Sequence, residues 1–203
     1  MSEETGGRRV VVNMSLSLDG HYAAPHDPLD MSWVMPYATT DVARDHLAAL
    51  HEPATTALLG RVNAEGFLGF WPSVIGMEGA DPRDEGFATW LVDTDKVVLS
   101  STLTEPPWER TTILDEPAPE VVRNLKATDG GDIVVLSSAS VIKALLAADM
   151  VDRLALMVFP VFLGGGPRLF DEGLPEATWS LTRDTAGEHG TLGLVYDRIR
   201  EGR

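Results

Sequence analysis

The chain has 203 residues, of which 44% are hydrophobic and 23% are charged, a balance that excludes collagen, coiled coil and wholly disordered chains. It contains no cysteine, which excludes disulfides, thiolate nucleophiles and every Cys-ligated zinc or iron–sulfur site. Because 31 acidic residues stand against 16 Lys and Arg, the formal net charge is −15, and neither nucleic acid nor a membrane is expected as a partner.

The chain begins with MSEETGGRR, which lacks the apolar core of a signal peptide, and no uninterrupted apolar run is long enough to span a bilayer. The sequence therefore predicts a cytoplasmic protein. We expect a single domain over residues 1–203, because no composition break or internal repeat marks a linker. Residues 1–8 are expected to form a disordered tail.

Residues 10–18 start with a β-branched run and continue with alternating polar and apolar residues, and the turn dipeptide Asp19-Gly20 follows. This pattern predicts a strand that ends in a turn. Residues 21–37 contain three prolines and no sustained period, which predicts a long loop. Apolar side chains three or four residues apart predict a helix over residues 40–51.

A short buried strand is predicted at 56–60, and residues 62–68 begin another helix. Residues 71–83 are rich in proline and glycine, which predicts a second loop. The apolar spacing within 87–91 predicts a short helical turn before a strand at 96–100.

A strand at 111–114 precedes a helix that has Pro119 in its first turn and ends before Gly130-Gly131. A buried strand at 133–136 and a helix at 138–148 follow.

A strand is then predicted at 153–162, interrupted by Pro160, and a loop at 164–175. The alternating stretches 179–183 and 192–199 predict a C-terminal antiparallel hairpin. Strands that alternate with helices indicate a three-layer α/β domain. We expect a mixed, mostly parallel sheet of about eight strands, with helices on both faces and the hairpin at its end.

The carboxyl ends of parallel strands meet at one edge of an open sheet, where ligands bind. Ser137, Ser138 and Ser140 open a helix there, and Arg61 follows Gly60 at another strand end. Free N–H groups at a helix N-terminus suit a phosphate, and a guanidinium binds one through two hydrogen bonds. The alternative remains that the serines cap the helix and that Arg61 is merely solvated.

Four segments, in this order, resemble the RibD C-terminal-like reductase family, which shares the dihydrofolate reductase fold. SLSLDGHYA at 15–23 resembles the family's S-L-D-G entry, and LLGRVNAEGF at 58–67 resembles its L-L-G-R-x-T-x-E-G-F. KVVLSSTL at 96–103 is similar to K-x-V-x-S-x-T-L, and residues 144–170 are similar to L-x-x-x-L-V-D-E-L-x-L-x-x-x-P-V-x-L-G-x-G-x-x-L-F. The likeness covers nearly the whole chain.

The resemblance implies an NADPH-dependent oxidoreductase that reduces a carbonyl or imine in a small planar heterocyclic or ribose-derived substrate. It resembles the reductase half of the riboflavin-biosynthesis deaminase-reductases, that is, a 5-amino-6-(5-phosphoribosylamino)uracil reductase, or a dihydrofolate reductase. Two alternatives stay open. One is a non-catalytic ligand-binding homodimer of the same fold with weakened nucleotide affinity, and the other is a flavin- or folate-binding protein without hydride transfer.

The family's cofactor-binding positions carry over to Gly60, Arg61, Ser100, Ser101, Thr102, Ser137, Ser138, Ala139, Ser140, Gly164 and Gly165. Arg61 would contact the 2′-phosphate, which favours NADPH over NADH. The family usually has a glycine at the position of Ser137, followed by glycine or serine. A side chain there resists close backbone approach or a positive φ, so weakened cofactor binding is predicted.

The family's substrate-binding positions carry over to Asn13, Ser17, Asp19, Gly20 and Pro160. Trp33 is added as a ring that could stack on a planar substrate, the alternative being that it only covers an edge of the sheet.

The folate reductases use a carboxylate on the first long helix in proton delivery, which makes Asp41 and Asp45 catalytic candidates, although their spacing equally describes a solvated acidic face. The five histidines lack metal-site spacing, so no metal is expected. The apolar stretch 154–162 and the C-terminal hairpin predict a homodimer.

Overall fold

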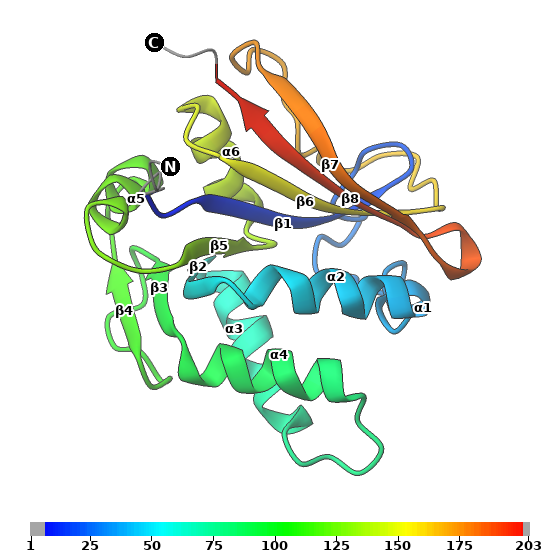
Figure 1. The fold of residues 1–203 in the computed structure, drawn as a ribbon, viewed down its shortest axis with the longest axis horizontal. Helices are drawn as coiled ribbons and strands as arrows, with labels where there is room; N and C mark the ends of the chain where they lie inside the picture. Colours follow the sequence, from blue (N-terminus) through cyan, green and yellow to red (C-terminus); the bar gives the residue numbers. More distant parts are fainter. Residues whose placement is uncertain (1–6, 201–203) are drawn as a thin grey trace, which may run out of the picture.

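The computed structural model describes residues 7–200 of the chain. Its centre is an eight-stranded sheet with the spatial order β4-β3-β2-β5-β1-β6-β8-β7 (Figure 1). The strands are Val10–Ser17 (β1), Ala54–Gly60 (β2), Asp95–Leu99 (β3), Thr111–Leu114 (β4), Asp132–Leu136 (β5), Arg153–Phe159 (β6), Thr178–Ala186 (β7) and Leu192–Ile199 (β8). The six strands from β4 to β6 are parallel, and β8 and β7 add antiparallel pairs. This is the sheet that the sequence predicted.

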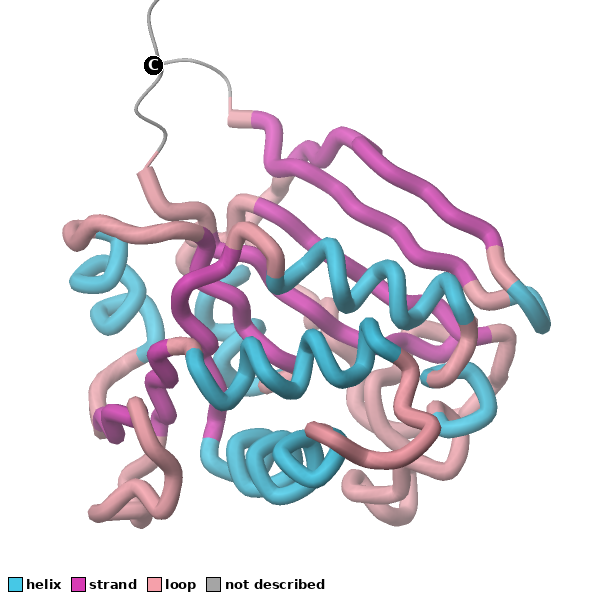
Figure 2. The backbone as a smooth tube through the Cα atoms, turned by 60° about the horizontal axis from the view of Figure 1, so that its bottom comes forward, coloured by secondary structure: helices cyan, strands magenta, loops and turns pink. Residues whose placement is uncertain are grey.

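Helices cover both faces of the sheet, as expected. The helices are Met35–Ala38 (α1), Asp41–His51 (α2), Arg61–Phe70 (α3), Pro82–Asp93 (α4), Ala118–Lys126 (α5) and Ala139–Ala147 (α6), with 3-10 turns at Trp71–Val74 (η1) and Glu188–Gly190 (η2). Helices α5 and α6 pack on one face, which we call the α6 face, and α2, α3 and α4 pack on the other, the α2 face. Figure 2 shows α2 and α4 side by side across the α2 face.

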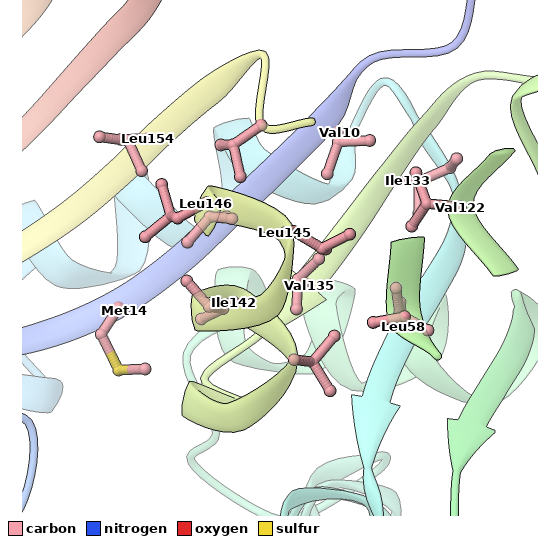
Figure 3. Packing of buried hydrophobic residues seen from close by; sticks show 14 of the residues in the cluster. Val10, Met14, Leu58, Val122, Ile133, Val135, Ile142, Leu145, Leu146 and Leu154 are labelled. Atoms are coloured by element: carbon pink, nitrogen blue, oxygen red, sulfur yellow. The ribbon is translucent and has the colours of Figure 1, made fainter. Parts of the chain in front are cut away.

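Strand β1 shows how the sequence assigns side chains to the two faces. Val10, Val12 and Met14 pack with α6 in one buried cluster (Figure 3), whereas Val11 belongs to the cluster on the α2 face. Successive side chains of a strand point to opposite faces. The apolar run at the start of β1 is therefore explained by burial on both sides.

Three predicted boundaries were wrong. The short helical turn at 87–91 is part of the twelve-residue helix α4, which begins at Pro82 after Asp81 accepts a hydrogen bond from the N–H of Arg83. The loop expected at 71–83 contains η1, and the loop expected at 21–37 contains α1. No helix within residues 7–200 is long and apolar enough to cross a membrane.

Two further predictions, the disordered tail at residues 1–8 and the strand at residues 153–162, differ from the structure. Residues 1–6 lie outside the described residues, but Arg8 is buried and hydrogen-bonded, so it is not part of a disordered tail. Strand β6 ends at Phe159 and not at residue 162, because Pro160 has no N–H to donate to the ladder. Strand β6 lies between β1 and β8, and most of its apolar side chains are buried on the two faces of the sheet, so they do not indicate a dimer interface.

Buried charges gather at the amino edge of the parallel strands, where each one is satisfied. Arg8 donates to the carbonyls of Leu125 and Gly131 and to three threonine hydroxyls of neighbouring segments. Lys96 donates to the carbonyl oxygens of Leu91, Val92 and Thr94 and so caps the end of α4.

Asp152, at the same edge, accepts hydrogen bonds from the N–H of Val10 and from the side chains of Lys126 and Arg200. Burial raises the pKa of Asp152, but the hydrogen bonds from Lys126 and Val10 outweigh burial and lower it overall. The motif residues Lys96 and Asp152 therefore fix the amino edge of the sheet.

Candidate functional site

A cavity of about 320 Å³ opens at the carboxyl edge, between the ends of β2 and β5. After β2 the chain crosses to the α2 face through α3, and after β5 it crosses to the α6 face through α6. Such a divergence is the topological switch point at which open α/β sheets bind ligands. The cavity is lined by Gly60, Arg61, Val62, Asn63, Leu99, Ala118, Ser138, Ser140, Val141 and Ala144.

Three helices present their N-termini to this cavity, and none of them is capped by a side chain. Helices α3, α5 and α6 have Gly60, Pro117 and Ser138 at their N-cap positions, without a side-chain hydrogen bond to the first turn. By contrast, Thr40 and Asp81 cap α2 and α4. The unpaired N–H groups and positive dipole ends at the cavity favour an anion.

Arg61 adds a full positive charge to the cavity. It is the first residue of α3, where the helix dipole disfavours a cation unless an anion is also present. Its Nη1 donates to Oε1 of Glu65 at 2.9 Å, and both side chains are nearly half exposed. An exposed pair of this kind contributes little to stability, and its Nη2 and Nε donors remain available for a phosphate.

The turn between β5 and α6 shows how Ser137 and Ser138 are used. Ser137 has a φ of +46°, a left-handed conformation that is unfavourable for most residues other than glycine and asparagine. The hydroxyl of Ser138 accepts a hydrogen bond from the N–H of Gly60 and donates to the carbonyl of Leu136, both at 2.9 Å. Ser138 therefore joins the two strand ends below the cavity, and its hydroxyl has no donor left for a ligand.

The predicted cofactor positions divide into two groups. Gly60, Arg61, Ser138 and Ser140 line the cavity, and Ser137 and Ala139 are their neighbours in the chain. Ser100, Ser101, Thr102, Gly164 and Gly165 are not among its lining residues. The hydroxyl of Ser100 instead accepts hydrogen bonds from the N–H groups of Thr102 and Leu103, which forms a turn after β3.

Asp19 fixes the turn after β1 to the loop after β6. Its carboxylate accepts hydrogen bonds from the Ser17 hydroxyl at 2.6 Å and from the N–H groups of Leu163 and Gly164. The Ser17 hydroxyl and then these N–H groups lower the pKa of Asp19 to about 2. Gly20 has a φ of +82°, which the tight turn requires. Asp19 is thus ionised and structural at neutral pH.

The aromatic residues at this edge differ from the expectation. Trp33 is only 8% exposed and packs edge to face against Phe159, so it covers the core and is not presented to a ligand. Phe162, two residues after the exposed Pro160, is 75% exposed. Exposure therefore favours Phe162 over Trp33 as the ring available for stacking.

The two proposed catalytic carboxylates are held by an arginine of the neighbouring helix. Asp41 and Asp45 form ion pairs with Arg83 of α4, at 2.6 and 2.7 Å. Their four-residue spacing therefore describes the interface between α2 and α4. No group of three or more His, Asp or Glu side chains within residues 7–200 is arranged to hold a metal ion.

A family model described as the RibD C-terminal domain matches residues 8–192. The chain belongs to this family. The match includes every residue that lines the cavity, and it confirms the resemblance carried by the four sequence motifs. No curated protein matches this RibD C-terminal domain.

Solved structures show the same fold. A putative riboflavin biosynthesis protein from Shewanella sp. PV-4 has a TM-score of 0.71 at 21% identity, and the match covers 95% of this chain and 99% of that one. Acinetobacter baumannii RibD has a TM-score of 0.68 at 16% identity, covering 96% of this chain and 59% of that one.

A Thermotoga maritima diaminohydroxyphosphoribosylaminopyrimidine deaminase/5-amino-6-(5-phosphoribosylamino)uracil reductase has a TM-score of 0.64 at 15% identity, covering 95% of this chain and 57% of that one. The RibD C-terminal domain described here therefore spans less than two thirds of the Acinetobacter and Thermotoga chains.

Sequence reasoning missed several lining residues because they come from helix faces and not from strand ends. Val141 and Ala144 lie on α6, and Ala118 begins α5. Pro119 had marked the start of α5 in the sequence, but nothing local indicates that this helix points its N-terminus at the same cavity as α3.

Proposed function

We propose that this RibD C-terminal domain is an NADPH-dependent reductase of a small planar heterocyclic or ribose-derived carbonyl or imine. The observation that carries the proposal is the cavity at the switch point, where Arg61 and three uncapped helix N-termini converge. In a chain of net charge −15, a cavity that holds an arginine and helix N-termini favours an anion as its ligand.

The residues present fit a dinucleotide phosphate. Arg61 would bind the 2′-phosphate through its Nη2 and Nε donors, and the N–H groups at the start of α6 would bind the pyrophosphate. The apolar side chains of Val62, Leu99 and Val141 would pack against the adenosine. NADPH bound in this way would supply a hydride toward the carboxyl ends of β1 and β6.

The residues at that edge would orient the substrate and exclude water more than they would transfer a proton. Asp19 is ionised at neutral pH because its pKa is about 2, so it has no proton to give. Asp41 and Asp45 are exposed and form ion pairs with Arg83 of α4. We therefore expect solvent or the substrate itself to supply the proton, and the protein to supply mainly orientation.

The proposal is tested by titrating the purified protein with NADPH and NADH and then repeating both titrations with Arg61→Ala. We expect NADPH to bind more tightly than NADH, and Arg61→Ala to weaken NADPH binding by roughly 1 to 3 kcal/mol, as for a charged hydrogen bond. NADH binding should stay almost unchanged. Arg123→Ala, an exposed arginine on α5 outside the cavity, is the matched control. Equal losses for both cofactors would reject the proposal.

The geometry of Ser137 keeps a second function open, a non-catalytic ligand-binding protein of the same fold. A side chain in the left-handed conformation at the start of α6 stiffens the turn that a pyrophosphate must approach. NADPH affinity weaker than about millimolar, together with no oxidation of NADPH by any pyrimidine or pteridine tested, would favour this alternative.

We also propose that the protein is a homodimer, on the evidence of the C-terminal hairpin alone. Strand β7 is an edge strand, and Leu181 and Ile199 on the hairpin are 47% and 45% exposed. A symmetric copy would cover this edge. Light scattering should give twice the chain mass of 22.0 kDa, and a monomer mass at all concentrations would reject the dimer.

A further inference from the structure

Three stretches of the chain meet around the carboxyl ends of β1 and β6. We call them the rim segments: the stretch between β1 and α2 (residues 18–40), the loop after β6 (160–167) and the turn between β7 and β8 (187–191). The N–H of Leu18 donates to the carbonyl of Val161, and Gly190 lies against Pro160. Figure 1 shows the turn between β7 and β8 at the same end of the sheet as α1, which belongs to the first segment. The rim segments therefore share one end of the sheet.

The charged side chains of the rim segments, apart from histidines, are all acidic. They are Asp19, Asp27, Asp30 and Glu188, and these segments contain no Lys or Arg. Asp19 is ionised at neutral pH because its pKa is about 2. Hydrogen bonds from Ser32 lower the pKa of Asp30 below its usual value, so this carboxylate is ionised as well. The rim segments therefore repel an anion.

The same segments expose large apolar side chains. Leu29 is 70% exposed and Phe162 is 75% exposed, and Leu18, Met31 and Met35 are also exposed. Exposed apolar side chains that gather at one site indicate a surface that binds an apolar ligand or partner. The rim thus presents apolar surface among acidic side chains.

The cavity between β2 and β5 has the opposite character. Arg61 and the uncapped N-termini of α3, α5 and α6 favour an anion there. An NADPH molecule that extends from this cavity toward the ends of β1 and β6 would have its phosphates at the positive end and its nicotinamide at the acidic, apolar end. A second phosphate group, on the substrate, would meet carboxylates of the same sign of charge at the rim.

The arginines that flank the rim segments are of two kinds. Arg44 of α2 and Arg83 of α4 pair with carboxylates of these two helices and of the residue that caps α4. Arg168, in a β-bridge with His21, and Arg183 of β7 are exposed and form no ion pair within residues 7–200. These two guanidinium groups are the ones that a phosphate at the rim would require, so the experiment removes each of them.

We propose that the substrate is a planar, uncharged carbonyl or imine that carries no phosphate group. Its ring would pack against the apolar side chains of the rim, and its neutral substituents would avoid repulsion by the four carboxylates. A ribose-derived substrate would accordingly be a nucleoside and not a nucleotide. The inference rests on the proposed function, because the rim borders the strand ends toward which bound NADPH would supply its hydride.

The test compares neutral rings with their phosphorylated forms, namely riboflavin with FMN and uridine with UMP. Each probe is titrated calorimetrically at about pH 8 with saturating NADP⁺, which fills the cavity and keeps the phosphate of the probe out of it. We expect the neutral member of a pair to bind at least about tenfold more tightly, because like charges oppose the phosphate. The difference should shrink when salt is raised from about 0.05 to 0.5 M, because salt screens exposed charges.

Four variants locate the effect. Phe162→Ser should weaken binding of the neutral rings about three- to tenfold, whereas Phe170→Ser, a control with an exposed ring on the α6 face, should not. Arg168→Ala and Arg183→Ala should leave the affinities for FMN and UMP unchanged. Thermal melts of each variant, which should match wild type, separate loss of binding from loss of fold.

Equal or tighter binding of the phosphorylated members, or no binding by any neutral member, would overturn the inference. A loss of FMN or UMP affinity in Arg168→Ala or Arg183→Ala would also overturn it, since it would identify a phosphate ligand at the rim. The proposed function fails separately, when wild type binds no nicotinamide cofactor. The probes are then titrated against Arg61→Ala without NADP⁺, because this variant lacks the guanidinium of the cavity.

Discussion

The two edges of the parallel strands differ in how fully their buried polar groups are hydrogen-bonded. At the amino edge Arg8, Lys96 and Asp152 each have several hydrogen-bond partners. The buried side-chain atoms without a partner within residues 7–200 belong instead to the turn, loop and helix segments toward the other edge, namely His21 Nδ1, Trp33 Nε1, His46 Nε2 and Thr191 Oγ1.

The cost of these unpaired groups explains the contrast. An unsatisfied buried polar group destabilises a fold by about 1 to 3 kcal/mol, whereas a satisfied one is neutral or favourable. The amino edge thus stabilises the sheet, whereas the unpaired buried atoms toward the carboxyl edge lower the stability of the fold. The two arginines differ in the same way. Arg8 at the amino edge has several hydrogen-bond partners, whereas Arg61 at the carboxyl edge forms only an exposed ion pair.

The largest expected effect is that of Arg8→Ala. Arg8 connects the start of β1 to the starts of β2 and β5 and to the end of α5, so its removal leaves several buried groups unpaired. We expect the free energy of unfolding to fall by about 3 kcal/mol or more, measured by urea denaturation. Arg123→Ala, which removes an exposed arginine that forms no ion pair within residues 7–200, should change it by less than about 0.5 kcal/mol. Similar losses in both variants would show that the hydrogen bonds of Arg8 at the amino edge do not stabilise the fold.

A smaller effect concerns His46, which lies in α2 against Gly193 of β8. Burial, and then the charge of Arg183, lowers the pKa of His46 to about 4 from 6.5. The unfolded chain therefore binds more protons between these two values, and stability falls as the pH drops from about 6.5 to 4, by up to about 3 kcal/mol.

The measurement is the unfolding free energy of wild type and His46→Leu between pH 7 and pH 4. The variant lacks the titrating ring, so its stability should fall less steeply over this interval. Parallel curves would show that His46 is not a source of acid sensitivity. The carboxylate of Asp19 does not contribute here, because its stabilisation is lost only as the pH falls below about 4 toward 2.

The smallest change in stability is expected for Ser137→Gly, at the carboxyl edge. Glycine removes the left-handed strain, about 1 kcal/mol, but loses about 0.5 to 1 kcal/mol of chain entropy, so the melting temperature should barely move. NADPH should bind more tightly by up to about 1 to 2 kcal/mol, because the backbone can approach the pyrophosphate.

Ser138→Gly is the contrasting variant, because the Ser138 hydroxyl joins Gly60 to Leu136. It should lose about 1 to 2 kcal/mol of stability. A Ser137→Gly protein with lowered melting temperature and unchanged NADPH affinity would favour a purely structural turn.

The sequence was sufficient for the sheet and its helices because apolar periodicity reports directly on burial. The β-branched run of β1 and the apolar face of α6 are examples. It was insufficient for α4, where the proline and glycine of residues 79–86 concealed a helix that begins at a proline.

The candidate site could be located but not fully assembled from sequence. Arg61 and Ser138 were identified by their place at strand ends, and the departure at Ser137 correctly indicated a position that favours glycine. The partners of Asp41 and the burial of Trp33 depend on contacts with Arg83 and Phe159, which are distant in the chain. Such contacts leave no local pattern in the sequence.

The central claim, that the carboxyl edge binds the cofactor and the amino edge does not, is tested most directly by mapping amide chemical shifts during titration with NADP⁺. The account predicts shifts at residues 60–63, 118 and 138–144, which line the cavity or lie among its lining residues, with saturation at one affinity. The amide chemical shifts of Arg8, Lys96 and Asp152 should not change. Shifts concentrated at the amino edge, or none at residues 60–63 and 138–144 at saturating NADP⁺, would contradict it.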